Sequence, residues 1–216
     1  MTGTACAVVQ FSYAKSFQTH RHQVYEIKRR IAKSRLRAGI GETHSAAQGG
    51  DPGKNWDFVR QYSLDSRGSR SPTLIYVVDA SVVVKWFLPE PDNAAADFLL
   101  EQFLNGETGL IAPDLLLVEF ASSLWKRVVL RKELTADEAT LVYRDLLTMP
   151  LSLIATETLA EAALQWAIKH KHPVYDALYC TLAIDRQCDF VTADQTMLNK
   201  FRGDLPFVRH LSMIKP

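Results

Sequence analysis

Long apolar runs are missing from this sequence of 216 residues. No stretch approaches the roughly 18 consecutive apolar residues that a membrane helix needs. The first residues, MTGTACAVVQFSYAK, also lack the basic start and the long apolar core of a secretion signal. We therefore expect a soluble, cytoplasmic protein with no membrane partner.

Cysteine is scarce and is not paired. Only Cys6, Cys180 and Cys188 are present, an odd number without CxxC spacing. The second and third of these lie among apolar residues, where a free cysteine usually behaves as a small buried hydrophobe. We expect reduced thiols there, and neither disulfides nor zinc ligands.

A net charge of only +1 hides an uneven distribution along the chain. Residues 1–72 hold 12 Lys and Arg against 5 Asp and Glu, a net charge of +7, and residues 73–216 hold 13 against 19, a net charge of −6. The first part is rich in Gly, Ser and Gln, so we expect a disordered or weakly ordered basic extension. The second part is acidic, and it needs bound divalent cations or other positive groups if it handles a polyanion.

From Thr73 onward, short apolar segments alternate with amphipathic ones. The run Leu-Ile-Tyr-Val-Val at 74–78 is typical of a strand buried on both faces of a parallel sheet. Strands that alternate with helices of about ten to fifteen residues favour an α/β sandwich around such a sheet. The expected strands are 74–78, 110–112, 151–154, 190–192 and 207–210, and the expected helices are 81–88, 92–105, 113–131, 135–150, 157–170, 174–186 and 196–201.

Four acidic residues interrupt these apolar segments. Asp79 ends the first strand, Glu119 lies within the apolar helix LLLVEFASSLW, Asp176 lies in the first turn of a helix, and Asp194 follows the fourth strand. The aspartates also have ordinary interpretations, because Asp caps helices well and a helix start favours an anion. Glu119 in an apolar helix is costly unless it is paired or bound to a cation. Ligands of such sheets bind beyond the carboxyl ends of the strands, where Asp79 and Asp194 are expected.

The chemistry of this set points to a divalent cation. If the four carboxylates converged without one, their repulsion would raise at least one pKa strongly and destabilise the fold at neutral pH. Hard cations prefer oxygen ligands, and no His or Cys cluster suggests zinc or copper. We therefore expect Mg²⁺ or Mn²⁺ at a site made of these acids.

Three segments carry a resemblance to a known family. YVVDASVVVKWFLPE, LLLVEFASSLWKR and HPVYDALYCTLAIDRQCDFVTADQTML occur in this order. They resemble the motifs of PIN-domain proteins, and most of all the VapC-type toxins of bacterial toxin–antitoxin pairs. The resemblance covers residues 73–216 and implies a PIN-like α/β/α sandwich with a central parallel sheet. It also implies a metal-dependent endoribonuclease that is held inactive by a cognate antitoxin and commonly forms a homodimer.

The resemblance also assigns roles to individual residues. The candidate catalytic residues and metal ligands are Asp79, Glu119, Asp176 and Asp194, and the supporting hydroxyl residues are Ser81 and Thr192. Where many relatives have Asn three residues after the glutamate, this chain has Ser122. This departure concerns the contacts around the acids and not the acids themselves.

The expected chemistry is hydrolysis of RNA phosphodiester bonds. A cation held by carboxylates lowers the pKa of a bound water that attacks phosphorus, and the same or a second cation offsets charge on the leaving oxygen. Asp79, Glu119 and Asp176 would hold the principal ion, and Asp194 would complete that site or support a second ion.

Other residues are candidates for contacts with RNA and with a second copy of the chain. Basic side chains that either guide the RNA backbone or are ordinary surface charges are Lys85, Lys126 and Arg127. Apolar helix residues expected as dimer contacts are Trp86, Phe87, Leu124 and Trp125.

Two other functions remain open. A strand that ends in Asp also occurs in phosphatases of the haloacid-dehalogenase type, but these need a second Asp two residues later, where this chain has Ser81. A PIN-fold module that binds RNA or an antitoxin without cutting is the main alternative. The presence of all four acids counts against it.

Within the basic extension, only residues 24–36 have helical spacing. Val24, Ile27 and Ile31 recur there among Lys and Arg. Such a helix would be either an arm for RNA phosphates or a solvated or non-native segment, for example from an over-extended gene start. We favour the second interpretation.

A chain that begins near Thr73 is expected to fold and to keep its activity, because the apolar periodicity begins only there. Thermal unfolding followed by circular dichroism, together with an RNA cleavage assay, tests this expectation. A shortened chain without a cooperative melt would show that residues 1–72 belong to the fold.

Overall fold

The computed structural model of the protein describes residues 74–90, 93–201 and 205–215. The expected basic extension over 1–72, including the segment 24–36 and Cys6, lies outside these residues. Asp92, which the sequence predicts to open a helix, also lies outside them. The domain boundary near Thr73 therefore stays a prediction.

Five parallel strands form one sheet in the order β3-β2-β1-β4-β5. Their bounds are β1 Leu74–Val78, β2 Thr108–Pro113, β3 Ser152–Ile154, β4 Asp189–Thr192 and β5 Val208–His210. β1 lies in the middle and pairs with β2 on one side and with β4 on the other. The chain therefore builds one half of the sheet, from β1 to β3, before it crosses to the other half.

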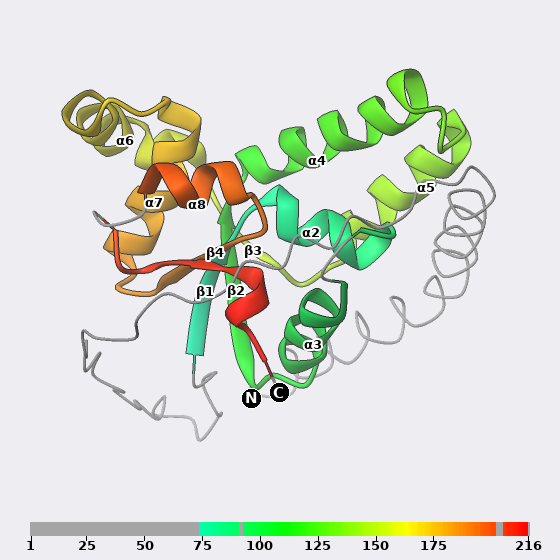
Figure 1. Ribbon diagram of the computed structural model, residues 1–216, viewed down its shortest axis with the longest axis horizontal. Coiled ribbons are helices and arrows are strands. Elements are labelled where there is room, and N and C mark those ends of the chain that lie inside the picture. Colours follow the sequence, from blue (N-terminus) through cyan, green and yellow to red (C-terminus); the bar gives the residue numbers. More distant parts are fainter. Residues whose placement is uncertain (1–73, 91–92, 202–204, 216) are drawn as a thin grey trace, which may run out of the picture.

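Helices cover both faces of the sheet, which confirms the expected α/β/α sandwich (Figure 1). The described helices are α2 Ala80–Phe87, α3 Asn93–Leu104, α4 Leu115–Trp125, α5 Ala136–Leu147, α6 Thr156–His170, α7 Val174–Asp185 and α8 Gln195–Phe201, with a π-helical turn η1 (Lys126–Leu130) after α4 and a 3-10 helix η2 (Leu211–Met213) after β5. α6 and α7 lie on one side of the sheet, and α2 and α3 lie on the other (Figure 1). α7 packs directly on β1, β2 and β4.

The end of β1 that leads into Asp79 is buried on both faces. Val77 and Val78 are fully buried, as are the residues of β4 that pair with them. Leu74 and Ile75 are instead 48% and 42% exposed. The expectation of a strand buried along its whole length is therefore wrong for the first half of β1.

Two helix starts follow from short polar signals in the sequence. Asp79 is the N-cap of α2, and its carboxylate accepts a hydrogen bond from the Val82 N–H. Thr135 and Glu138 form the predicted capping box of α5, in which each side chain accepts from the backbone N–H of the other residue. Both caps satisfy N–H groups that have no partner within their own helix.

The start of α4 differs from the prediction. The sequence places Pro113 in the first turn of a helix over 113–131, where proline is favoured, but Pro113 is the last residue of β2, opposite Ile154. The Asp114 N–H donates to the Ile154 carbonyl (2.9 Å), and the helix begins at Leu115. A strand end tolerates proline because the missing N–H interrupts no inner part of the ladder.

Arg127 is buried within the π-helical turn η1, so neither expected role for it is correct. Its guanidinium pairs with Glu90 and, at 2.6 Å, with Glu133, and its side chain is 3% exposed. The Arg131 N–H donates to the Lys126 carbonyl, the i to i+5 pattern of this wider turn. The two ion pairs hold Arg127 in the interior, where it is neither a surface charge nor a guide for RNA.

Of the other two basic candidates, only one is accessible. Lys85 is 6% exposed because α2 is buried on almost every side. Lys126 is exposed. The role proposed for Lys85 is therefore wrong, and that of Lys126 stays a prediction.

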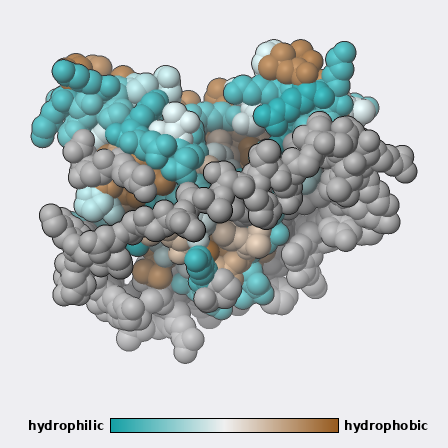
Figure 2. All heavy atoms as spheres, in the orientation of Figure 1, coloured by the Kyte–Doolittle hydropathy of each residue, from teal (hydrophilic) through white to brown (hydrophobic). Residues whose placement is uncertain are grey.

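Of the four apolar residues expected as dimer contacts, only Trp125 is exposed. Trp86, Phe87 and Leu124 are at most 4% exposed and belong to the core, so they are not available as contacts. Trp125 is 54% exposed. Figure 2 shows a hydrophobic patch over the outer side of α4. Exposed apolar residues of α4 and η1 besides Trp125 are Val118, Val129 and Leu130.

Two further expectations concern thiols and membranes. Cys180 is buried and Cys188 is partly buried, and both are free thiols, as the sequence predicts. No helix in the described part of the chain is long and apolar enough to cross a membrane.

Replacing Arg127 by Met is expected to lower the free energy of unfolding by about 3 kcal/mol, because removing one partner leaves Glu90 and Glu133 facing each other without their cation. Arg186→Met is the control, since the Arg186–Asp185 pair is about half exposed on both sides and is expected to contribute at most about 1 kcal/mol. Urea unfolding measures both. Equal effects of the two substitutions would contradict a buried ion-pair role for Arg127.

Candidate active site

The carboxyl ends of β1 and β4 lie side by side, because these strands are parallel neighbours. Asp79 follows β1 directly, and Thr192 ends β4, with Asp194 two residues later. The direction of the strand order reverses between these two strands. In open parallel sheets, ligands bind in the crevice at such a point.

Asp79 is held by hydrogen bonds from α2 and β4. Its Oδ1 accepts from the Ser81 hydroxyl (2.6 Å) and from the Val82 N–H (3.2 Å), and its Oδ2 accepts from the Thr192 hydroxyl (2.6 Å). The Ser81 hydroxyl oxygen also accepts from the Ala193 N–H (2.8 Å). The structure therefore brings Asp79 together with both hydroxyl residues singled out by the sequence.

Asp194 extends this network to α8. Its N–H donates to the Thr192 hydroxyl oxygen (3.0 Å), and its Oδ1 accepts from the Thr196 and Met197 N–H groups (2.7 and 3.2 Å). Asp194 thus caps α8, which is the ordinary interpretation of this residue. Its side chain is exposed, and its Oδ2 accepts no hydrogen bond from the described residues.

Glu119 is half-buried on α4 and is bound by a tyrosine of α7. The Tyr179 phenol donates to Glu119 Oε2 at 2.5 Å. Tyr179 is 1% exposed, and its ring stacks on Phe190 of β4 with a centroid distance of 5.5 Å. This contact brings α4 to the same edge of the sheet as Asp79.

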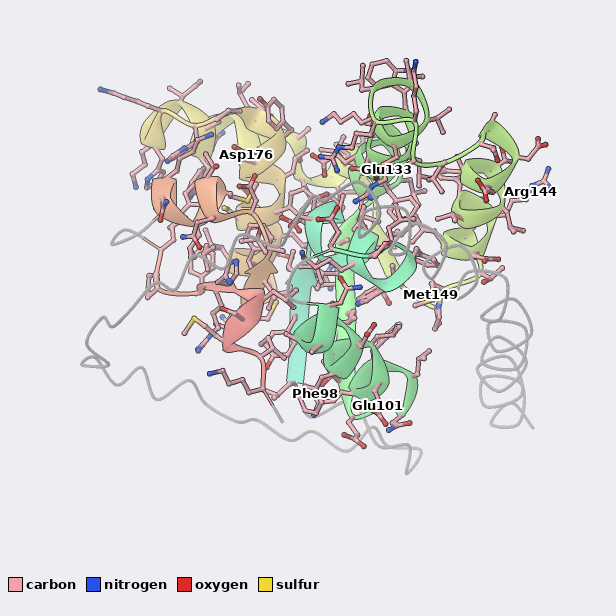
Figure 3. The ribbon with its side chains drawn as sticks, turned by 45° about the vertical axis from the view of Figure 1, so that its right-hand side comes forward. Phe98, Glu101, Glu133, Arg144, Met149 and Asp176 are labelled. Atoms are coloured by element: carbon pink, nitrogen blue, oxygen red, sulfur yellow. The ribbon has the colours of Figure 1, made fainter. Side chains whose placement is uncertain are left out.

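Asp176 lies in the first turn of α7, near the upper end of the molecule in Figure 3. Its side chain is 10% exposed, and Lys200 Nζ lies 3.9 Å from its Oδ2. His172 lies nearby, and its ring packs on Phe201 with a centroid distance of 4.5 Å. Asp176 is therefore the acid with positive charge beside it.

These acids form one electrostatic unit, called here the acidic cluster (Asp79, Glu119, Asp176 and Asp194). Burial is the largest influence on the first three, and it raises the pKa of each because it disfavours the ionised form. The charge of Asp194 further raises the pKa of Asp79 and of Asp176. The charges of Asp79 and Asp176 raise the pKa of Glu119. The charge of at least one other member therefore raises the pKa of each of these three acids.

The donor set fits a hard divalent cation in its chemistry. All four side chains offer oxygen, and Glu119 Oε1 and Asp194 Oδ2 accept no hydrogen bond from the described residues. Among those residues, no three His, Cys, Asp or Glu side chains already converge as a metal site. An ion would therefore have to draw the carboxylates together, and its charge would offset the repulsion among them.

Sequence reasoning missed three residues beside the cluster as functional candidates: Tyr179, Lys200 and His172. Tyr179 follows Asp176 by three residues, a spacing that puts both on one face of a helix, so a signal for it was present. Lys200 lies on α8, and its distance to Asp176 depends on where the fold places α8 relative to α7. No local pattern indicates that contact.

Asp114 shows how a structural acid differs from the cluster. It follows β2, and its Oδ1 accepts from both the Thr156 N–H (2.9 Å) and the Thr156 hydroxyl at the start of α6. These bonds lower the pKa of Asp114, which is exposed. For Asp114, hydrogen bonds lower the pKa more than burial raises it. For Asp79, Glu119 and Asp176, burial has the larger effect and the pKa is raised.

Asp79→Asn and Asp176→Asn are expected to be at least as stable as the wild type at neutral pH in EDTA. The folded-state pKa of each aspartate is raised above its ordinary 3.8, so ionisation costs stability as the pH rises through the raised value. Asn also keeps the capping function of residue 79. The stability gained by each variant should vanish at acidic pH, where the wild-type carboxyl is protonated in both states.

Asp114→Asn is the matched control with the opposite sign. Its lowered pKa means that the ionised form stabilises the fold at neutral pH and that this contribution is lost as the pH falls through the folded-state value. Urea unfolding from acidic to neutral pH measures all three variants. If the free energy of unfolding relative to the wild type changed with pH in the same direction in all three variants, the electrostatic assignment of the cluster would be contradicted.

Comparison with family models identifies the family of this chain. A family model described as PIN domain matches residues 76–202, more than half of the chain. The chain is also similar to the crystal structure of PAE2754 from Pyrobaculum aerophilum, with a TM-score of 0.45, 20% identity, and coverage of 66% of this chain and 88% of that chain. A toxin–antitoxin complex from Klebsiella pneumoniae matches with a TM-score of 0.40, 14% identity, and coverage of 63% of this chain and 97% of that chain. No curated protein matches the sequence significantly. The segment that the family model matches contains the whole acidic cluster, and the chain belongs to the PIN domain family.

Proposed function

We propose that this PIN domain is a divalent-metal-dependent endoribonuclease and the toxin of a toxin–antitoxin pair. The observation that carries the proposal is the acidic cluster, in which Asp79 and Asp176 are buried, Glu119 is half-buried and Asp194 is exposed, near the reversal point of the sheet. Burial raises the pKa of Asp79, Glu119 and Asp176, so the ionised cluster is costly until a cation binds. Perturbed carboxylates in a crevice are typical of functional sites.

Asp79, Glu119 and Asp176 would hold the principal Mg²⁺ or Mn²⁺ ion, and Asp194 would complete the site or support a second ion. When bound, the cation supplies Lewis acidity to a water molecule and offsets charge on the leaving oxygen. Ser81 and Thr192 orient Asp79 and favour its ionised form, because their hydroxyls donate to its two oxygens. Lys200 is 46% exposed beside Asp176, where its ammonium would face an RNA phosphate.

The partners proposed are an RNA substrate, a cognate antitoxin and a second copy of the chain, in the cytoplasm. The motif resemblance supports the antitoxin and the homodimer. The exposed apolar residues of α4 and η1, with Trp125 among them, offer a surface for such contacts.

A PIN-fold module that binds RNA or an antitoxin without cutting is the second candidate. One observation favours it: within the described residues, no three acidic or metal-binding side chains already converge. The two candidates differ in whether added cation produces cleavage.

Cleavage of total RNA by the full chain tests the proposal. Activity is expected with Mg²⁺ or Mn²⁺, is expected to disappear with EDTA, and should fall at least about 100-fold in Asp79→Asn and Asp176→Asn, because each removes a charged ligand of the ion. The Asp114→Asn control, which alters a carboxylate outside the cluster, should keep nearly full activity. An inactive wild type at millimolar Mg²⁺ and Mn²⁺, or active Asn variants of the cluster, would sink the nuclease proposal.

A further inference from the structure

Glu119 differs from Asp79 and Asp194 in how it is held. Asp79 and Asp194 accept hydrogen bonds from backbone N–H groups at helix starts. Glu119 lies in the middle of α4, where backbone N–H groups are engaged within the helix. A glutamate also has one more rotatable bond than an aspartate. Its carboxylate therefore needs a side-chain partner to stay in place.

Tyr179 is that partner. Its phenol donates to Glu119 Oε2 at 2.5 Å, and Glu119 accepts no other hydrogen bond from the described residues. A phenol has an ordinary pKa of about 10, so it carries its proton at neutral pH. Tyr179 is thus the donor in this hydrogen bond.

Tyr179 is itself fixed by the core. It is 1% exposed, and its ring stacks on Phe190 of β4, with 5.5 Å between the centroids and 10° between the planes. Asp176 lies three residues earlier on α7, so the two side chains share one face of that helix. α7 therefore supplies one acid of the cluster directly and holds a second one through Tyr179.

We propose that Tyr179 is a positioning residue that fixes Glu119 so that Oε1 faces the divalent cation while Oε2 stays bound to the phenol. This inference rests on the proposed metal-dependent function. Loss of a hydrogen-bond partner of a metal ligand typically lowers metal affinity about 10- to 100-fold. Tyr179 therefore raises the affinity of the site without touching the ion.

Isothermal titration of the full chain with Mn²⁺ tests this inference without an activity assay. Tyr179→Phe, which keeps the stacked ring and removes only the hydroxyl, is expected to weaken Mn²⁺ binding about 10- to 100-fold. Glu119→Gln should weaken it at least as much. The double variant should bind no more weakly than Glu119→Gln alone, because Tyr179 acts only through that carboxylate. If the Tyr179 hydroxyl instead acted independently of Glu119, its removal would weaken Mn²⁺ binding further in the Glu119→Gln variant.

Tyr143→Phe is the matched control. Tyr143 lies on α5, and its ring packs on Phe120, beside Glu119, with a centroid distance of 6.4 Å. Loss of its hydroxyl should leave Mn²⁺ affinity unchanged, and cooperative thermal unfolding should show that both Phe variants fold. Wild-type affinity in Tyr179→Phe, loss of its cooperative unfolding, or a further loss of affinity in the double variant overturns the inference while leaving the proposed function intact. A wild type that does not bind Mn²⁺ overturns both.

Discussion

Asp79 is buried directly after β1, and the rest of the candidate site depends on the hydrogen bonds that favour its ionised form there. Burial raises the pKa of Asp79, and donors from two different elements oppose that effect. Ser81 belongs to α2, and Thr192 ends β4. These donors meet only because β1 and β4 are parallel neighbours whose carboxyl ends coincide. The same carboxylate also caps α2, so one side chain links the start of a helix, the end of a strand and the candidate metal site.

The contrast with Asp114 separates an acid that stabilises the fold from the acids proposed to bind a cation. Asp114 follows β2, just as Asp79 follows β1 of the same sheet. Asp114 is exposed and accepts two hydrogen bonds from Thr156, and these lower its pKa. Within the acidic cluster, burial and like charges outweigh the hydrogen bonds, and the pKa values of Asp79, Glu119 and Asp176 rise. Perturbed carboxylates of this kind are typical of functional sites, and we propose that a divalent cation offsets their charge.

The sequence predicts the parts of this structure that depend on local patterns. The alternation of apolar strands and amphipathic helices predicts the α/β/α sandwich, and the Thr135–Glu138 spacing predicts a capping box. Glu119 is conspicuous because its helix is otherwise apolar. Pro113 is misplaced because proline suits a strand end as well as a first helical turn. The Arg127–Glu90 and Tyr179–Glu119 contacts join residues that are 37 and 60 positions apart in the chain, so no local pattern could predict them.

We propose above all that the acidic cluster binds a divalent cation as one unit. The most direct test of this proposal is a crystal structure of the full chain soaked in Mn²⁺, with the ion located by its anomalous scattering. We expect an ion bound by Asp79, Glu119 and Asp176, with the Tyr179 phenol still donating its hydrogen bond to Glu119 Oε2. Mn²⁺ found only away from these side chains, or a cluster that stays open and empty at millimolar Mn²⁺, would contradict this proposal.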